Sequence, residues 1–236
     1  MGGMEEVIDG ILVAASELKR PLFEMRQLAL SFEGLSPEDA VMRDQMVSIS
    51  ERAMRQVNDL QKLRKLADGK YEMGPVAVRP VCDEVTRELV DLFRFNRREL
   101  FVNYSSRLGL VTANRELLKS VVYNFLLNAV HYSGDEVRSE LVVRETRGNV
   151  RVTVRDFGPA LPMDVWREMK RGWVKRPESI AMRPGSSGLS LYIASKFSKY
   201  MHAGVGAVRH RDGTSFYVDL PVSRQLLLWS DDDFGD

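Results

Sequence analysis

The chain has 236 residues, 44% of them hydrophobic and 28% charged, and a formal net charge of +1. These proportions are ordinary for a globular protein of one large or two small domains. A net charge of +1 gives no electrostatic field strong enough to attract nucleic acid or an anionic membrane. No apolar run reaches the roughly 20 residues that span a bilayer, no signal-peptide pattern opens the sequence, and the lone Cys82 excludes an internal disulfide. We therefore expect a cytoplasmic protein without a membrane span and without a nucleic-acid partner.

Residues 1–74 are predicted to form a helical hairpin. Apolar residues recur every three or four positions over 7–32 and again over 46–67, which is the period of an amphipathic helix. Gly34 ends the first helix, and Ser36 with the following proline begins the second. Such a hairpin cannot bury both faces alone, so we expect a homodimer through residues 1–74 that forms a four-helix bundle. Packing of the hairpin on its own domain is the alternative.

Residues 75–223 alternate between strand and helix patterns, and residues 224–236 form a predicted acidic tail. The interleaving predicts an α/β sandwich, in which one sheet is backed by a layer of helices. The whole fold is then α+β, a hairpin followed by this sandwich. The predicted strands are 76–78, 100–104, 108–112, 141–143, 150–154, 204–209 and 214–220, and the predicted helices are 82–96, 114–132 and 189–200.

Two asparagines mark the predicted helix 114–132. Asn124 and Asn128 are four residues apart, so they share one face of the helix. An amide oxygen is a hard, neutral ligand that suits Mg²⁺, and Mg²⁺ bridges the phosphate oxygens of nucleotides. The helix is otherwise strongly apolar, and an unpaired buried amide costs about 1–3 kcal/mol. We therefore interpret the pair as a ligand site rather than as two solvent-facing polar residues.

A predicted buried strand ends just before Asp156, and Gly158 lies two residues further on. A carboxylate at a strand end can accept a hydrogen bond from the exocyclic amine of adenine. Glycine lets the backbone approach a flat base closely. An ordinary turn after a strand is the alternative interpretation of these two residues.

A basic loop and a helix start rich in small residues come next. The loop 170–176 could close over a triphosphate as a lid. The next predicted helix opens with free backbone amides, which can hold phosphates. Alone, this pattern is also typical of a surface loop with a helix cap. The residues concerned are Gly185, Ser186, Ser187, Gly188 and Leu189.

In this order and at these spacings, the three pieces resemble the N, G1 and G2 boxes of the GHKL ATPases, in the histidine-kinase branch. The resemblance extends over essentially the whole chain. Residues 1–74 look like the dimerisation and phosphotransfer domain, and residues 75–223 look like the ATP-binding catalytic domain. The resemblance implies ATP and Mg²⁺ as cofactors, a role in two-component signalling, and a response regulator or another histidine kinase as partner.

The resemblance also implies roles for individual residues. Asn124 and Asn128 correspond to the magnesium-binding pair, Asp156 to the adenine-reading aspartate, and Gly185 and Gly188 to the phosphate-loop glycines. His131 stands where a phosphate-contacting lysine is usual, and Tyr132 follows it. Trp166 and Trp173 fall in the segment that resembles the F box, and Ala160 and Ser190 replace glycines of the G1 and G2 boxes.

The phosphoacceptor histidine of the resembled family is absent from the hairpin. Where that family carries H-E-L-R-T-P-L, this chain has Ser16-Glu17-Leu18-Lys19-Arg20-Pro21-Leu22, and its histidines lie only at 131, 202 and 210. A serine hydroxyl needs a base to take its proton before it can attack a phosphoryl group. Glu17 is the adjacent candidate base for Ser16. We hypothesise that the hairpin cannot be autophosphorylated on histidine.

Two classes of function remain open at this stage. In the first, the chain is a histidine-kinase-type phosphotransferase that acts on Ser16 or on a histidine of a partner, or Ser16 is an engineered replacement in an ordinary kinase. In the second, it is a pseudokinase, a dimeric ATP-sensing and partner-binding module without autophosphorylation. Transfer of label from γ-labelled ATP separates the two classes.

Overall fold

The computed structural model describes residues 17–132, 138–171 and 188–223. Ser16, residues 185–187 and the predicted acidic tail lie outside these ranges. The chain divides into two compact units, Met1–Lys70 and Tyr71–Asp236. Among the helices within these ranges, none has the length and apolarity needed to cross a membrane.

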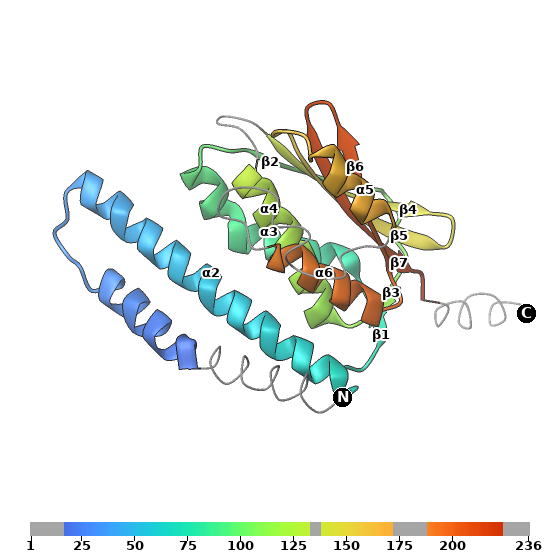
Figure 1. The fold of residues 1–236 in the computed structure, drawn as a ribbon, viewed down its shortest axis with the longest axis horizontal. Coiled ribbons are helices and arrows are strands. Elements are labelled where there is room, and N and C mark those ends of the chain that lie inside the picture. Colours follow the sequence, from blue (N-terminus) through green and yellow to red (C-terminus); the bar gives the residue numbers. More distant parts are fainter. Residues whose placement is uncertain (1–16, 133–137, 172–187, 224–236) are drawn as a thin grey trace, which may run out of the picture. The chain divides into compact units, whose positions relative to one another are not determined.

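The first unit is a pair of antiparallel helices, formed by residues 17–30 and α2 (Pro37–Ala67) (Figure 1). Ser36 caps α2 as predicted, because its side chain accepts a hydrogen bond from the Asp39 amide at 3.2 Å. The two helices are joined by Lys19 Nζ, which donates to Gln61 at 2.9 Å, and by Arg26 Nε, which donates to Glu51 at 2.7 Å. These contacts pair the start of one helix with the end of the other, as in an antiparallel hairpin.

The hairpin exposes many large apolar side chains, each with 43–64% of its surface open to solvent. They come from both helices and from the connection between them. The side chains are Leu18, Phe23, Met25, Leu28, Leu30, Phe32, Val41, Met42, Met46 and Ile49. So large an apolar surface is typical of a face that another chain covers.

The second unit is a five-stranded sheet with helices against one face, together with a small two-stranded sheet (Figure 1). The strand order is β2-β4-β5-β7-β6, in which only β2 and β4 are parallel, and β1 pairs with β3 separately. The elements are β1 (Gly74–Val76), α3 (Val78–Phe95), β2 (Leu100–Tyr104), β3 (Val111–Ala113), α4 (Arg115–Tyr132), β4 (Ser139–Thr146), β5 (Asn149–Asp156), α5 (Met163–Arg171), α6 (Leu189–Tyr200), β6 (Gly204–His210) and β7 (Gly213–Pro221).

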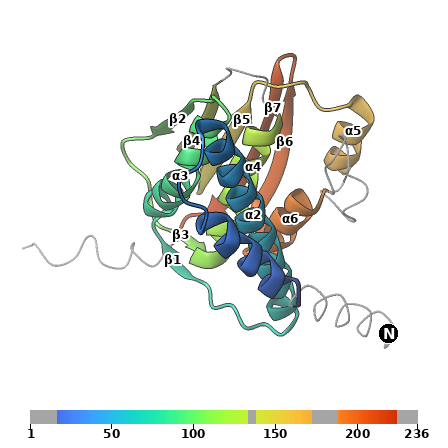
Figure 2. The same ribbon diagram turned by 90° about the vertical axis from the view of Figure 1, so that its left-hand side faces the viewer.

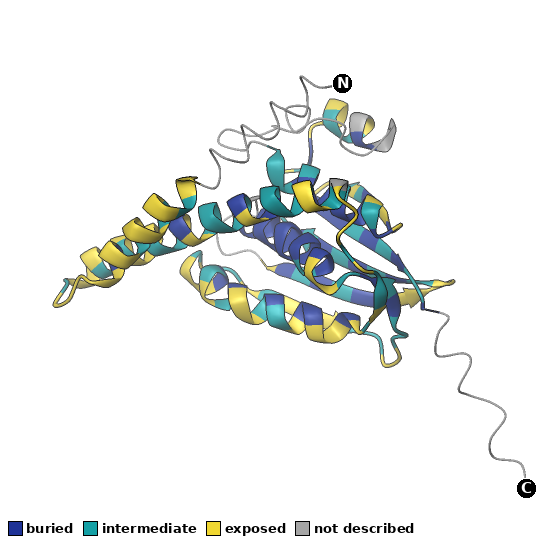
Figure 3. Cartoon of the chain, turned by 90° about the horizontal axis from the view of Figure 1, so that it is seen from below, coloured by how far each residue is buried: buried dark blue, intermediate teal, exposed yellow. Residues whose placement is uncertain are grey.

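The core lies between the sheet and helices α3, α4 and α6, where Figure 3 shows most of the buried positions. Alternate residues of β5 (Val150, Val152 and Val154) are buried, as expected for a sheet with one covered face. Phe125 of α4 is fully buried and stacks on Phe216 of β7, with the ring centroids 5.9 Å apart. The predicted fold class, a helical N-terminal region followed by an α/β sandwich, is confirmed.

Three predicted elements differ from the structure. The first strand is Gly74–Val76 rather than 76–78, because Val78 already begins α3 and Pro80 is tolerated in that first turn. The strand predicted at 108–112 is β3, which is shifted to Val111–Ala113. The start of the predicted basic lid is the end of helix α5 (Met163–Arg171), and residues 172–176 lie outside the described ranges.

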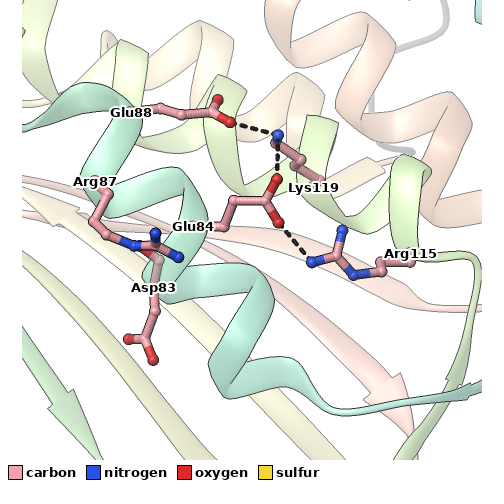
Figure 4. A network of polar contacts seen from close by, with 6 residues as sticks. All are labelled: Asp83, Glu84, Arg87, Glu88, Arg115 and Lys119. Carbon is pink, nitrogen blue, oxygen red and sulfur yellow. Dashed lines mark hydrogen bonds and ion pairs between the residues drawn. The ribbon is translucent and has the colours of Figure 1, made fainter.

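An ion-pair network fastens α3 to α4 (Figure 4). Glu84 accepts hydrogen bonds from Lys119 Nζ and Arg115 Nη2, both at 2.6 Å, and Lys119 also pairs with Glu88. The hydrogen bonds from Lys119 and Arg115 lower the pKa of Glu84 from 4.5 to about 2. The charged form of Glu84 is therefore the form that the fold favours.

We expect Glu84→Gln to destabilise the protein by about 1 kcal/mol at neutral pH, because the substitution replaces a charged acceptor by a neutral one. A carboxyl whose pKa is lowered on folding stabilises the protein above its unfolded pKa, and this stabilisation is lost as pH falls toward the folded pKa. Urea midpoints of wild type and variant should therefore converge as pH falls from about 5 to about 2, the folded pKa of Glu84. A pH-independent difference, or an equal effect of Glu116→Gln on the exposed side of α4, would contradict this role.

Candidate functional site

The two asparagines of α4 lie on its buried surface. Asn124 is 3% exposed, and its Nδ2 donates to the Ser120 carbonyl at 2.9 Å. Asn128 is 6% exposed, and its Nδ2 has no hydrogen-bond partner within the described part of the chain. A buried donor left unpaired costs about 1–3 kcal/mol, so the Asn128 amide is a group that a ligand would satisfy. His131 and Tyr132 end α4, and their side chains are outside what the structure describes.

Asp156 is 2% exposed at the end of β5 and fixes two backbone segments. Its Oδ1 accepts hydrogen bonds from the Gly158 amide at 3.2 Å and from the Thr214 amide at 3.1 Å. Gly213 passes so close that a Cβ there would lie 2.0 Å from the Asp156 carbonyl oxygen, and its φ is +142°. A glycine is therefore required where β7 begins beside the end of β5.

Thr214 is a further candidate site residue, which no sequence motif reveals. It is fully buried next to Asp156, and within the described ranges its Oγ1 has no hydrogen-bond partner. The hydroxyl can both donate and accept, which suits an edge of a heterocyclic base. The signal in the sequence is weak, since only the pairing of β5 with β7 places this threonine beside the aspartate.

The turn that follows Asp156 is held by cation–π contacts of two arginines with the Phe157 ring. The guanidinium of Arg155 lies 4.2 Å from the centroid of the Phe157 ring, and that of Arg138 lies 5.0 Å away. Arg155 Nη2 also donates to Asp212 at 3.1 Å, in the turn between β6 and β7. These contacts fix the segment that carries Asp156 and Gly158 against the neighbouring strands.

The helix α6 begins at Leu189 without a side-chain cap. Gly188 is the residue before it and has a φ of 66°, the left-handed region that favours glycine. Since no side chain caps this end, an anion can bind to the first amides of the helix. Gly185, Ser186 and Ser187 lie outside the described residues, so the structure describes only the last two members of the predicted phosphate loop.

The structure places Asn124 and Asn128, Asp156, and Gly188 on or next to three neighbouring elements, α4, β5 and α6. Helix α4 packs against both α6 and β5. Phe125, next to Asn124, stacks on Phe216, which lies two residues beyond Thr214 and pairs with Val154 of β5. Glu17 is exposed in the hairpin unit, and Ser16 is outside the described ranges. Within the described residues no three His, Cys, Asp or Glu side chains gather as a metal site.

Comparison with known proteins points to one class. Residues 113–224 match the family described as histidine kinase-, DNA gyrase B-, and HSP90-like ATPase. The chain is 22% identical to hybrid signal transduction histidine kinase K of Dictyostelium discoideum, over 87% of this chain and 18% of that protein. It is 23% identical to the adaptive-response sensory kinase SasA of Microcystis aeruginosa, over 91% of this chain and 59% of that protein.

Solved structures show the same fold. Full-length ShkA, solved in complex with AMPPNP, superposes with a TM-score of 0.63 and 21% identity, over 91% of this chain and 46% of that one. The Acinetobacter baumannii histidine kinase AdeS gives a TM-score of 0.58 and 13% identity, over 87% of this chain and 97% of that one.

The family match over residues 113–224 and the likeness to histidine kinases confirm the predicted resemblance. The chain spans 18%, 50% and 59% of the length of three of its curated relatives.

Proposed function

We propose that this chain binds Mg-ATP in its second unit and acts as a histidine-kinase-like signalling protein in two-component-type phosphoryl transfer. The observation that carries the proposal is the pair of buried polar groups, Asn128 Nδ2 and Thr214 Oγ1, that lack hydrogen-bond partners within the described residues. Both lie in the part of the chain that matches the ATPase family. The complex of the structural neighbour ShkA with AMPPNP supports a nucleotide as the missing partner.

Each residue has a role in this proposal. Asp156 and Thr214 bind the edge of the adenine ring. The Asp156 carboxylate is a buried hydrogen-bond acceptor, and the Thr214 hydroxyl can both donate and accept a hydrogen bond. Asn128 and Asn124 supply amide oxygens for Mg²⁺, which would neutralise charge on the phosphates. Gly158 lets the backbone approach the flat base. The remaining proposed contacts to the nucleotide come from His131, Tyr132, Gly185, Ser186, Ser187, Gly188 and Leu189.

We expect Asn128→Ala to weaken ATP binding about tenfold in Mg²⁺ and by clearly less in EDTA, because in Mg²⁺ the substitution removes a metal ligand as well as the Nδ2 donor. Calorimetric titration in both media measures the two affinities. Asn103→Ala, on the exposed surface of β2, is the matched control and should change neither. Equal losses of affinity in Mg²⁺ and in EDTA would argue against the metal role.

The acceptor of the phosphoryl group defines two forms of the proposal. In the enzyme form, Ser16 with Glu17 as base, or a histidine of a partner, takes the γ-phosphoryl group. In the pseudokinase form, the chain binds ATP and regulates a partner without autophosphorylation. The pseudokinase form is favoured by one observation, the serine at the position where the resembled family has histidine.

Incubation with γ-labelled Mg-ATP followed by phosphoamino-acid analysis tests the function. Acid-stable label on Ser16, or label on a histidine kinase or response regulator added in trans, supports the enzyme. Saturable ATP binding without label on any protein supports the pseudokinase. Acid-labile label on the hairpin would overturn the hypothesis that the hairpin cannot be phosphorylated on histidine.

We also propose that the chain dimerises through residues 1–74, since the hairpin exposes a broad apolar surface on both helices. A four-helix bundle would bury this surface against a second copy. Sedimentation equilibrium should therefore give a dimer at micromolar concentration, and Leu28→Glu should shift it toward monomer. A wild-type monomer under these conditions would contradict the proposal. The same bundle offers a surface for a response regulator or another histidine kinase.

A further inference from the structure

Strand β2 forms one edge of the five-stranded sheet, with β4 on one side and, in the part of the chain that the structure describes, no strand on the other (Figure 2). The Ser139 amide donates to the Glu99 carbonyl at 2.7 Å, and the Ser105 amide donates to the Val143 carbonyl at 2.9 Å. In a parallel pair, alternate residues turn both backbone groups toward the partner strand. The backbone groups that point away from β4 are therefore those of Leu100, Val102 and Tyr104.

Side-chain contacts with α3 hold β2 in place at its carboxyl end. The Tyr104 hydroxyl donates to the Asp83 carboxylate, and the Arg79 guanidinium lies 4.6 Å from the centroid of the Tyr104 ring. Arg79 Nη2 also donates to the Ser105 carbonyl at 3.3 Å. The open edge is thus already fixed as a strand, so a segment that pairs with it pays little to order it.

The β2 edge exposes apolar side chains on both faces of the sheet. Phe101 is 52% exposed and Val102 is 37% exposed, and successive residues of a strand point to opposite faces. Phe95, at the end of α3 just before the strand, is 39% exposed. An open edge with apolar side chains is a template for pairing with another strand, and proteins usually cover it.

The surroundings of this edge are basic. Residues 94–107 contain four arginines and one glutamate, a net charge of +3. Arg97 precedes the strand by three residues, Arg107 follows it by three, and both are exposed. Of the acids nearby on α3, Asp83 is bonded to Tyr104, and Asp91 pairs with Arg94 at 3.5 Å. A segment that pairs with β2 therefore meets positive charge at both ends.

We propose that the β2 edge binds an extended segment of a partner protein as an added strand, with β-branched residues in the middle of that segment and carboxylates at both of its ends. The outward backbone groups of β2 give the hydrogen bonds, and the exposed Phe101 and Val102 give the apolar contacts. The carboxylates meet the arginines on either side of the strand, which selects acidic partners. The proposal does not depend on nucleotide binding.

A second copy of this chain fits the edge less well than an acidic segment does. Two β2 strands paired antiparallel about Val102 would set Arg97 opposite the partner subunit's Arg107. Like charges directly opposite each other across a strand pair are destabilising. The edge therefore favours a partner of opposite charge.

A fluorescein-labelled peptide of sequence D-E-V-T-V-T-V-E-D tests the proposal by fluorescence anisotropy and by hydrogen exchange followed residue by residue. We expect saturable binding, and at saturation the outward amides of Leu100, Val102 and Tyr104 should exchange at least about tenfold more slowly. The amides of Phe101 and Asn103, which face β4, are the internal control and should change little. No saturable binding at about 1 mM peptide, or unchanged outward amides at saturation, would overturn the proposal.

Charge variants test the choice of partner. Arg97→Glu combined with Arg107→Glu should weaken peptide binding at least about tenfold, and so should lysines in place of the four acids of the peptide. The matched control is Arg211→Glu, which lies in the exposed turn before β7 at the opposite edge of the sheet and should bind as the wild type does. Equal affinity of the wild type and the double variant would contradict the proposal.

The chain without peptide gives a further test, because other occupants would protect the same amides. We expect the amides of Leu100, Val102 and Tyr104 to exchange without protection at every protein concentration. Protection that rises with protein concentration would show a second copy at the edge. Protection that is independent of concentration would show that the chain covers its own edge. Either result would contradict the proposal.

Discussion

Asp156→Asn should weaken ATP binding by about 30- to 100-fold, which corresponds to about 2–3 kcal/mol. The carboxylate is 2% exposed and is held by the amides of Gly158 and Thr214. The amide of asparagine can still accept one hydrogen bond, but it presents a donor where the adenine amine needs an acceptor. Titration calorimetry of both proteins with Mg-ATP measures the change.

The matched control for this substitution is Asp91→Asn, the same chemical change on a side chain that is 90% exposed on α3. It should bind ATP as the wild type does. Thermal unfolding should show that Asp156→Asn remains folded, since asparagine keeps an oxygen acceptor for the backbone amides. Wild-type affinity in folded Asp156→Asn would remove this residue from the proposed site.

Phe125→Ala should have the largest effect on stability, a loss of about 3–5 kcal/mol in the free energy of unfolding of the second unit. The side chain is fully buried and stacks on Phe216, so its removal leaves a cavity where α4 meets β7. Urea unfolding of the variant measures the loss. Phe125→Leu, which keeps most of the apolar volume, should cost about 1 kcal/mol.

Phe125 also connects stability with the proposed site, because it adjoins Asn124 and touches the strand that carries Thr214. Nucleotide affinity should therefore fall in Phe125→Ala even at temperatures where the variant is folded. Equal stabilities of the alanine and leucine variants would show that the ring does not fill the core as the structure indicates.

Local patterns were sufficient to predict most of the sandwich. The apolar run around Asn124 and Asn128 predicted a buried helix, and the alternation over 150–154 predicted a strand with one covered face. Helix α5 has no clear signal in the sequence, since its basic end has the composition of a lid loop. The first strand lies two residues earlier than its apolar pattern predicts, because α3 already begins at Val78 and includes Pro80 in its first turn, where proline is tolerated.

The sequence predicts only those residues of the candidate site that stand in a recognisable local pattern. Asp156 ends an apolar strand and precedes a glycine, so it can be found by pattern. Thr214 cannot be found in this way, because it meets Asp156 only through the pairing of β5 with β7 across 58 positions of sequence. The need for Gly213 likewise arises from a tertiary approach, in which one strand passes beside the end of another.

The most direct test of the account is a calorimetric titration of the wild-type chain with ATP in the presence of Mg²⁺. We predict saturable binding of one ATP per chain, and weaker binding when Mg²⁺ is removed. A similar nucleotide that lacks the exocyclic amine of adenine should not bind. No saturable binding at millimolar ATP by a folded protein would contradict the proposal that the buried amide of Asn128 and the hydroxyl of Thr214 serve a nucleotide.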